Sequence, residues 1–486
     1  MRYNPDSMLA VKNPFTFILF GASGNLAKLK LYPALYVLAL KKRLPADYAI
    51  VGYARTAMDD ASFRALVEES IRTDMPEVTE TALAGFLAHI TYVTGKYDDV
   101  KDLRALTERV KTLSKEWKDT VRLAYLSVPP QVEAALLQSM CAAGLHSGEP
   151  FRCIVEKPVG HDLRSFEEIY KQFTHCVDAT EIYPLDHYLG KEAVRNVYYL
   201  RYANPLLERL FKHTLIRSVE MTATETLGIE SRAGYFEHVG AFRDMFQSHL
   251  LQLCALLTMD TKDTEEQIGK SRLEALGKLY LPPASSLDEV AIQGQYVAGV
   301  ENEKEVHGYR EEDGVDRNSR TNTYAALKLL SRESRWQGVP FYLRSGKRLR
   351  RKETRISILF HEPRSVGRGS APNRLDMIVQ GEGGMKFHLQ TKLGGTEPAF
   401  RPLILEDPLV CVGDCLPEHA LLILEAIAGK KTWFLSPEEI RTAWRLTDPL
   451  QSHFDHPNTP LHMYPSGSDG PKEAEEWIRR EGLNWL

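Results

Sequence analysis

The stretch that decides the fold is "FILFGASGNLAKLKLYPALY", Phe17 to Tyr36, in which an apolar run ends at a glycine and continues as a lysine-bearing amphipathic segment. A buried parallel strand, a glycine turn and an emerging helix together form the arrangement that binds a dinucleotide pyrophosphate. Gly21 permits the tight turn, Gly24 lets the backbone approach the phosphates, and N–H groups at the helix start donate hydrogen bonds. The spacing is GxxGxxxK, neither GxGxxG nor a P-loop, so a plain strand-to-helix turn is the alternative.

Composition indicates a globular chain with no general attraction to polyanions. Of 486 residues, 43% are hydrophobic and 26% charged, and the net charge is only −4. We therefore expect no nucleic acid partner, and no apolar run approaches the roughly 20 residues that a membrane span needs. The start lacks a signal-peptide pattern, which favours a cytoplasmic protein. The six cysteines show no metal-site pattern, and we expect all six to be reduced and no metal to be bound.

The order of apolar and helical segments indicates two domains. Up to about residue 185, short apolar runs alternate with helical patterns, which is typical of βαβ units and a parallel sheet. Beyond residue 190, alternating strand patterns between long helices predict a mostly antiparallel sheet with helices on one face. We expect an α/β, Rossmann-like domain over 1–185 and a larger α+β domain over 186–486. The expected strands are 15–20, 48–54, 90–95, 123–128 and 151–158 in the first domain, and 216–228, 289–299, 321–330, 354–360 and 374–381 in the second.

The end of the second strand bears on the choice of dinucleotide. "IVGYART" ends in Arg55 and Thr56, where an enzyme specific for NAD more often places an acid to hold the ribose 2′-hydroxyl. An arginine there can pair with a 2′-phosphate, which favours NADP. Asp59 and Asp60 follow closely, and an ordinary solvated charge is the alternative for Arg55.

Polar residues at the end of a later strand extend the candidate site. In "IVEKPVG", an apolar strand delivers Glu156, Lys157 and Pro158 to the carboxyl edge of the sheet, where ligands bind in open α/β sheets. A lysine held there by a rigid strand can bridge substrate oxygens and the cofactor. The alternative is a surface lysine at a strand end.

A compact set of donors follows in "YPLDHYLGKEAVRN". His187 and Lys191 stand at i and i+4, on one face if a helix begins there, and Tyr188 lies between them. Imidazole, phenol and ammonium groups together suit a phosphate or another polyoxygenated anion. Asp186 is an acceptor, so it either orients a histidine or caps a helix.

A third cluster supplies a candidate base. The segment from 222 to 257 contains Glu225 and Asp244, and then a helix in which His249 sits among apolar positions. A lone histidine in such a helix is more often a core residue than a base. Paired with a carboxylate, it becomes a good general base near neutral pH.

Six ordered motifs resemble the glucose-6-phosphate dehydrogenase family over nearly the whole chain. They are "GASGNLAKLKLYPALY", "YAR", "EKPVG", "DHYLGKE", "RAGYFEHVGAFRDMFQSHLLQL" and "VPFYLRSGKRL". The resemblance implies oxidation of β-D-glucose 6-phosphate at C1 to 6-phosphogluconolactone, with hydride transfer to NADP and NAD as a possible second acceptor. This reaction is the first step of the oxidative pentose phosphate pathway. The resemblance also implies a homodimer or homotetramer.

The resemblance assigns roles to residues of all three clusters. It makes His249 the general base on the C1 hydroxyl and Asp186 its partner in a catalytic dyad. It places the 6-phosphate on His187, Tyr188 and Lys191. The implied sugar contacts are Lys157, Glu225, Asp244, Lys347, Lys352 and Gln380, and the implied cofactor contacts are Gly21, Ala22, Ser23, Gly24, Asn25, Leu26, Arg55, Tyr125 and Lys157.

Three departures from the family pattern lie near these residues. Asn25 stands where Asp is usual, Pro184-Leu185 where Arg-Ile is common, and Val159 in place of Phe. The first bears on cofactor contacts and the others on the pocket wall. Two alternatives are a related sugar oxidoreductase, since an EKP lysine also occurs in the inositol and glucose-fructose oxidoreductase group, and a catalytically silent dinucleotide-binding scaffold.

Overall fold

The computed structural model describes residues 9–261, 264–301, 303–362, 371–380, 383–410 and 414–486. They form two compact units. The first unit consists of the residues up to Lys191 together with a later segment that ends at Pro437. The second unit begins at Glu192 and, after that segment, continues from Glu438. The sequence predicted a single boundary after residue 185 and did not predict the returning segment.

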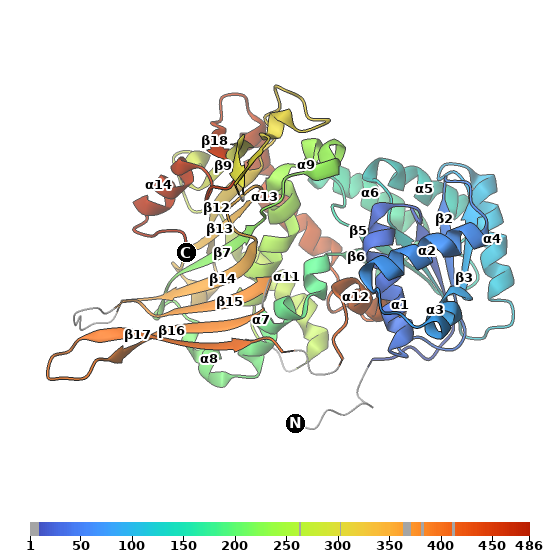
Figure 1. The fold of residues 1–486 in the computed structure, drawn as a ribbon, viewed down its shortest axis with the longest axis horizontal. Helices are drawn as coiled ribbons and strands as arrows, with labels where there is room; N and C mark the ends of the chain where they lie inside the picture. Colours follow the sequence, from blue (N-terminus) through green and yellow to red (C-terminus); the bar gives the residue numbers. More distant parts are fainter. Residues whose placement is uncertain (1–8, 262–263, 302, 363–370, 381–382, 411–413) are drawn as a thin grey trace. The chain divides into compact units, whose positions relative to one another are not determined.

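The first unit contains a six-stranded parallel sheet in the order β3-β2-β1-β4-β5-β6. Its strands β2, β3, β5 and β6 are labelled in Figure 1. The strand order is that of a dinucleotide-binding fold, so the expected Rossmann-like architecture is confirmed. The central strand is buried along its whole length, as the run "FTFILF" predicts for a strand covered on both faces. The strands are β1 (Phe15–Phe20), β2 (Tyr48–Ala54), β3 (Ile90–Thr94), β4 (Val121–Leu126), β5 (Phe151–Glu156) and β6 (Ile182–Leu185).

The helices of this unit pack in two groups. In one group α1 contacts α2, α3 and α12, and in the other α5 contacts α4 and α6, which is the pattern of a doubly wound sheet. The bounds are η2 (Ala27–Leu31), α1 (Tyr32–Leu40), α2 (Asp60–Asp74), α3 (Glu80–Leu87), α4 (Val100–Leu113), α5 (Pro130–Ala142), α6 (Leu163–Cys176), η3 (Ala179–Glu181), η4 (His187–Gly190) and α12 (Glu418–Ile427).

Polar contacts attach the returning segment to the first unit. The Arg152 guanidinium donates to the carbonyl of Ala426 at 3.1 Å. The ammonium of Lys431 donates to the carbonyl of Ile182 at 2.9 Å, and the amide of Leu435 donates to the carbonyl of Pro184 at 3.0 Å. These hydrogen bonds join residues more than 200 positions apart in the sequence, and their acceptors are main-chain carbonyls. Such contacts leave no local sequence pattern, so the sequence alone could not reveal this attachment.

The second unit is built on a ten-stranded sheet in the order β17-β16-β15-β14-β7-β13-β12-β9-β18, with β8 paired to β12. It is mostly antiparallel, as expected; β13 runs parallel to β7, and β18 parallel to β9. The strands are β7 (Ile216–Thr224), β8 (Leu279–Tyr280), β9 (Ala291–Val297), β12 (Tyr324–Ser331), β13 (Phe341–Gly346), β14 (Glu353–Phe360), β15 (Arg374–Gln380), β16 (Gly384–Lys392), β17 (Phe400–Pro408) and β18 (His462–Pro465); β10 (Gly299–Glu301) and β11 (Lys304–Val306) form a separate ribbon.

Helices of the second unit pack on the sheet and on one another. Helix α9 contacts β12 and β13, α7 contacts β15, and α10 contacts both α7 and α11. The bounds are α7 (Glu192–Tyr202), α8 (Pro205–Leu210), η5 (Glu230–Arg232), α9 (Ala233–Met245), η6 (Phe246–Leu250), α10 (Leu251–Thr258), α11 (Ile268–Lys278), α13 (Pro437–Asp455) and α14 (Lys472–Arg480); the short 3₁₀ turns are η7 (Glu265–Gln267), η8 (Leu287–Glu289), η9 (Tyr309–Glu311) and η10 (Ser334–Trp336).

The helical segment from 233 to 258 is interrupted twice. Gly240 has a φ of 66° and breaks α9, and Asn322 compensates for the break. Its carbonyl accepts the amide of Ala241 at 2.8 Å, and its side-chain oxygen accepts the amide of Phe242 at 2.9 Å. The second interruption is the π-helical turn η6, which carries His249. The sequence predicted one continuous helix there.

The cysteines do not all follow the prediction. Cys141 and Cys176 form a disulfide between the ends of α5 and α6, and Cys415 is also disulfide-bonded, so the expectation of six reduced cysteines is wrong for these three residues. Cys153 and Cys254 are free and buried. Among the described residues, no helix is both long and apolar enough to cross a membrane.

Replacing Gly21 by alanine should destabilise the first unit more than the same change at a glycine with open surroundings. Gly21 and Gly148 both have positive φ, but a Cβ on Gly21 would lie 1.9 Å from the carbonyl oxygen of Ser127, whereas one on Gly148 would meet nothing. We expect a loss of about 1 to 2 kcal/mol for Gly148→Ala and about 2 to 5 kcal/mol for Gly21→Ala in thermal unfolding. Equal losses would show that the turn relaxes around the added methyl group.

Candidate active site

The glycine turn lies where β1 passes between β2 and β4. The amide of Gly21 donates to the carbonyl of Tyr53 on β2 at 3.0 Å, and the amide of Ser127, after β4, donates to the carbonyl of Phe20 at 3.1 Å. Gly21 has a φ of 80°, which other residues rarely adopt. The strand order reverses between β1 and β4, and ligands of open α/β sheets bind at such a point. The turn therefore fits a dinucleotide pyrophosphate.

The other predicted residues of the turn divide into a buried and an accessible set. Ala22 is fully buried, whereas Gly24 and Asn25 are exposed at the start of the helix and Leu26 is half-buried. The hydroxyl of Ser23 lies 3.1 Å from that of Thr56, which ties the turn to the end of β2. The sequence analysis gave Thr56 no role, because a single hydroxyl after a strand carries no pattern.

Arg55 is exposed at the end of β2, and its guanidinium lies 5.8 Å from the centre of the Tyr97 ring. The two nearby aspartates are engaged elsewhere. Asp59 caps α2 by accepting the amide of Ser62 at 2.8 Å. Asp60 accepts the amide of Tyr92 at 2.7 Å and pairs with Arg109 at 3.1 Å. Arg55 is thus exposed at this end of β2, whereas the two aspartates are engaged in a helix cap and an ion pair.

A partly buried carboxylate precedes Lys157. Glu156, at the end of β5, accepts a hydrogen bond from the hydroxyl of the fully buried Tyr125. Burial raises the pKa of Glu156 to about 7, although Tyr125 and Lys157 both act to lower it. Tyr125 was predicted to contact the cofactor. It is fully buried, and the contact that its hydroxyl makes in the structure is the hydrogen bond to Glu156. Lys157 itself is half-buried.

The turn after β6 collects the predicted phosphate ligands. Residues His187–Gly190 form a 3₁₀ turn and Lys191 is extended, so the helix on which a shared i, i+4 face depended does not begin there. The ammonium of Lys191 instead lies over the Tyr188 ring, 4.1 Å from its centre. Asp186 is fully buried, and its carboxylate caps the turn by accepting the amide of Tyr188 at 2.9 Å. The alternative role predicted for Asp186, the capping of a helical turn, is therefore observed in the structure.

Helix α12 adds a histidine that the sequence analysis missed. The ring of His419 is parallel to that of His187, with 6.1 Å between the ring centres. Its Nε2 lies 3.9 Å from a carboxylate oxygen of Glu156. Burial lowers the pKa of His419 to about 4, so it is neutral at physiological pH. It belongs to the returning segment, and no motif marks it.

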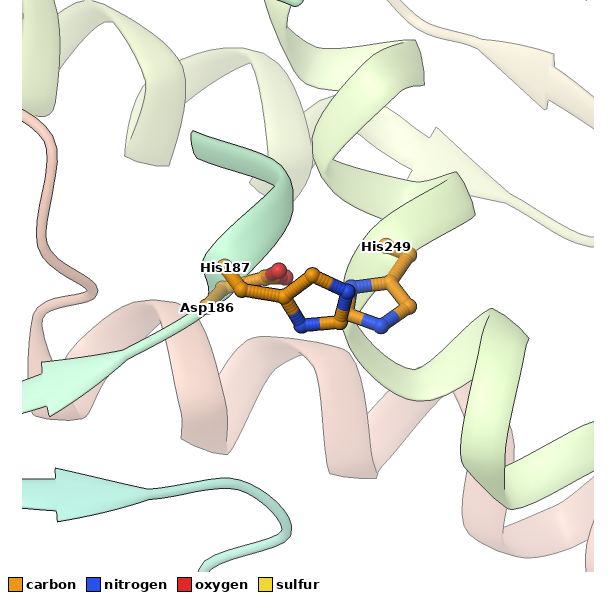
Figure 2. A group of neighbouring side chains, drawn as sticks. All are labelled: Asp186, His187 and His249. Atoms are coloured by element: carbon orange, nitrogen blue, oxygen red, sulfur yellow. The ribbon is translucent and has the colours of Figure 1, made fainter. Parts of the chain in front are cut away.

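His249 is almost fully buried in the second unit, at 2% exposure. It lies on the π-helical turn η6, and such turns are frequent at functional sites. Figure 2 shows its ring projecting from a helix, and it shows Asp186 and His187 on the turn that follows a strand. Asp186 and His187 belong to the first unit, and His249 belongs to the second.

Glu225 and Lys347 form an ion pair in the second unit. They follow the parallel strands β7 and β13, which end side by side, so the sheet brings the two side chains together. Lys347 is buried, and its ammonium lies 5.4 Å from the centre of the Phe236 ring. Asp244 is half-buried and accepts a hydrogen bond from the Tyr235 hydroxyl at 3.4 Å.

Two further predicted sugar contacts lie along β14 and β15. Lys352 is exposed just before β14. Gln380 ends β15, and its side-chain oxygen accepts a hydrogen bond from the Thr354 hydroxyl at 3.1 Å. Among the described residues, neither Lys352 nor Gln380 forms a hydrogen bond or an ion pair with Glu225 or Lys347.

A Rossmann unit with a glycine turn at its switch point, together with a second unit that contains a buried histidine and an acid–lysine pair, defines a two-domain dinucleotide-binding protein. Residues 18–196 match the model of the glucose-6-phosphate dehydrogenase NAD binding domain, and residues 198–486 match that of the C-terminal domain. The chain belongs to the glucose-6-phosphate dehydrogenase family.

Individual relatives agree. The chain is 34% identical to glucose-6-phosphate 1-dehydrogenase of Chlamydia pneumoniae, over 97% of this chain and 96% of the relative. It is 33% identical to the enzyme of Bacillus subtilis strain 168, over 96% and 97%. A solved structure of glucose-6-phosphate dehydrogenase in complex with glucose 6-phosphate superimposes with a TM-score of 0.88 at 28% identity, covering 99% of this chain and all of that one.

The pH dependence of stability should reveal a buried acid beside the site. Glu133 on α5 is 1% exposed, and burial, with repulsion from Glu156, raises its pKa to about 8 from an ordinary 4.5. Between those pH values the unfolded chain releases this proton and the folded chain keeps it, so the free energy of unfolding falls as pH rises, by at most about 1.4 kcal/mol per pH unit.

Glu133→Gln removes that proton equilibrium. We expect its advantage in urea unfolding over the unchanged protein to grow from pH 5 to pH 8 and then to level off. The exposed Glu116 provides the control, since Glu116→Gln should show no such trend. A constant difference between Glu133→Gln and the unchanged protein would contradict the raised pKa.

Proposed function

We propose that this chain oxidises the C1 hydroxyl of β-D-glucose 6-phosphate to 6-phosphogluconolactone, with hydride transfer to a nicotinamide dinucleotide. The observation that carries this proposal is the full-length match to both domains of the family, together with a glycine turn at the switch point. The structural relative that contains glucose 6-phosphate supports the same substrate. The reaction is the entry step of the oxidative pentose phosphate pathway.

The 6-phosphate is assigned to the turn after β6. His187, Tyr188 and Lys191 offer imidazole, phenol and ammonium donors within a few residues. The Tyr188 ring supports the ammonium of Lys191 from one side, which limits the positions that this flexible side chain can take. A phosphate held there would anchor the sugar by a group remote from the reacting carbon.

His249 is proposed as the general base and Asp186 as the acid that orients it. A bound nicotinamide ring would supply the hydride acceptor. His249 would take the proton of the C1 hydroxyl, and a carboxylate would fix its tautomer and stabilise the imidazolium form. Both side chains are buried, which supports this assignment, because a charge interacts more strongly with an imidazole in the low dielectric of the protein interior than in water.

The remaining sugar contacts are proposed from the predicted set. Glu225 would accept hydrogen bonds from sugar hydroxyls while Lys347, already paired with it, would donate to them. Lys157, at the carboxyl end of β5, would reach the C1 region and the cofactor. The other members proposed are Asp244, Lys352 and Gln380.

NADP is proposed as the preferred acceptor and NAD as a second one. The support is the exposed Arg55, together with the engagement of Asp59 and Asp60 in a helix cap and an ion pair. An arginine at this position can pair with the 2′-phosphate that distinguishes NADP from NAD. The turn residues Gly21 to Leu26 would hold the pyrophosphate.

A cytoplasmic homodimer or homotetramer completes the proposal. The outermost strand of the large sheet, β17, exposes Ile404 at 53% and Leu405 at 51%. Adjacent residues of a strand point to opposite faces, so both faces of this edge are partly apolar. Burial against a second copy would remove that surface from water.

The proposed reaction is tested by NADPH or NADH formation at 340 nm with purified protein. We expect reduction with glucose 6-phosphate and little with glucose, because glucose lacks the anchoring phosphate. We also expect faster reduction of NADP than of NAD, and Arg55→Ala should reduce this preference by roughly 10-fold, as the loss of one charge-assisted contact to the 2′-phosphate predicts. Absence of turnover with both acceptors would refute the function.

His249→Asn should lower kcat by roughly 10²- to 10⁴-fold, the usual contribution of general base catalysis, while binding of glucose 6-phosphate is retained. Steady-state rates and isothermal titration with the sugar phosphate would measure the two quantities. The exposed His238, on the segment of α9 before the kink, provides a matched control, and His238→Asn should leave kcat unchanged. Near-normal turnover of His249→Asn would refute its role as base.

A further inference from the structure

Arg348 stands next to the sugar-binding lysine in a backbone conformation that arginine rarely adopts. Its φ is 52°, in the left-handed region, where a residue with a Cβ is strained. Such strain persists only where surrounding contacts hold the residue in place, and it is frequent at ligand sites. The contacts that hold Arg348 all lie within the second unit.

Three carboxylates from different segments surround its guanidinium. Glu301, at the end of β10, accepts from it at 3.1 Å, and Glu312, after η9, lies 3.5 Å away. Glu230, on η5, is 3.7 Å away. The Tyr296 hydroxyl also donates to Glu312, at 2.8 Å, so strand β9 joins the same cluster. The Arg348 side chain is only 14% exposed.

The same arginine packs against the loop that begins with Glu225. A Cβ on Gly228 would lie 2.7 Å from both Nε of Arg348 and a carboxylate oxygen of Glu312, so only glycine fits there without displacement. The amide of Arg348 donates to the carbonyl of Leu227 at 3.2 Å. The guanidinium thus packs against Gly228, and the main chain of Arg348 is bonded to Leu227.

Main-chain hydrogen bonds transmit that packing to the ion pair. The amide of Glu225 donates to the carbonyl of Gly346, and the amide of Leu349 donates to the carbonyl of Glu225, each at 2.9 Å. The Tyr464 hydroxyl donates to the carbonyl of Lys347 at 2.7 Å. The main chain of Glu225 is therefore bonded to residues before and after Arg348 in the sequence, and that of Lys347 is bonded to Tyr464.

We propose that Arg348 is a positioning residue for sugar recognition, which holds the loop after β7 against the end of β13 so that Glu225 and Lys347 meet the sugar as a preformed pair. This inference rests on the proposed sugar contacts of Glu225 and Lys347. Without the guanidinium, Glu301, Glu312 and Glu230 would repel one another, and the loop would lose the group that it packs against. The pair would then have to be ordered by the sugar itself, at a cost in affinity.

Arg348→Met tests this role, because methionine keeps part of the apolar stem and removes the charge. We expect the KM for glucose 6-phosphate to rise roughly 10-fold, as for the loss of a charged hydrogen bond, with kcat within about threefold and the KM for the dinucleotide unchanged. Arg348→Lys should recover part of the loss. Arg350 is the matched control: it is exposed and pairs with Asp469 at 3.3 Å, and Arg350→Met should leave both KM values unchanged.

A lower melting temperature of Arg348→Met with an unchanged KM for glucose 6-phosphate would show a merely structural role and overturn the inference. Should Arg348→Met fail to fold, Glu312→Gln weakens the same cluster and is expected to raise that KM roughly threefold; an unchanged KM in that variant would equally overturn it.

A double-mutant cycle separates this inference from the sugar-contact assignment. Glu225→Gln should raise the KM for glucose 6-phosphate, and Arg348→Met should add little in that background, because both act through the same pair. Additive effects would overturn the positioning role alone. An unchanged KM in Glu225→Gln would overturn the assignment of Glu225, and the inference with it.

Discussion

The structure of the first unit depends on one steric constraint at the end of β1. There the chain must leave a strand that is buried on both faces, and the carbonyl of Ser127 lies so close to the turn that a Cβ on Gly21 would lie 1.9 Å from it. Glycine, which has no Cβ and readily adopts the observed φ of 80°, is the residue that fits this turn without displacing its neighbours. Main-chain hydrogen bonds to β2 and to the residue after β4 hold the turn on either side, and Gly24 and Asn25 beyond it are exposed.

Buried and partly buried polar groups lie together near the carboxyl edge of the sheet. Tyr125 holds Glu156, the raised pKa of Glu156 follows from its burial, and His419 lies between Glu156 and the ring of His187. These groups connect the strand that carries Lys157 with the turn that carries the predicted phosphate ligands. Buried polar groups that are hydrogen-bonded define orientation more than they add stability, and orientation is what a site for sugar oxidation requires.

Local irregularities coincide with the candidate residues in both units. His249 lies on a π-helical turn, and Lys191 leaves a 3₁₀ turn in an extended conformation. Arg348 has a left-handed backbone beside Lys347. Apolar periodicity predicted a regular helix at His249, and at Lys191 a helical face was expected only if a helix began at that turn. Tertiary contacts override local preference at both positions. All three positions lie within the motifs that carry the resemblance to the family.

The sequence by itself determined the parallel sheet, the glycine turn, five strands of the larger sheet and the family, because apolar periodicity and glycine spacing are local properties of the chain. Only the tertiary structure decided the disulfide between Cys141 and Cys176, the return of the segment that carries His419, and the carboxylates around Arg348. Each of these joins residues that are far apart in the chain. Their contacts depend on how the elements pack, and a carboxylate or a histidine without its neighbours carries no signal of the partner it will meet.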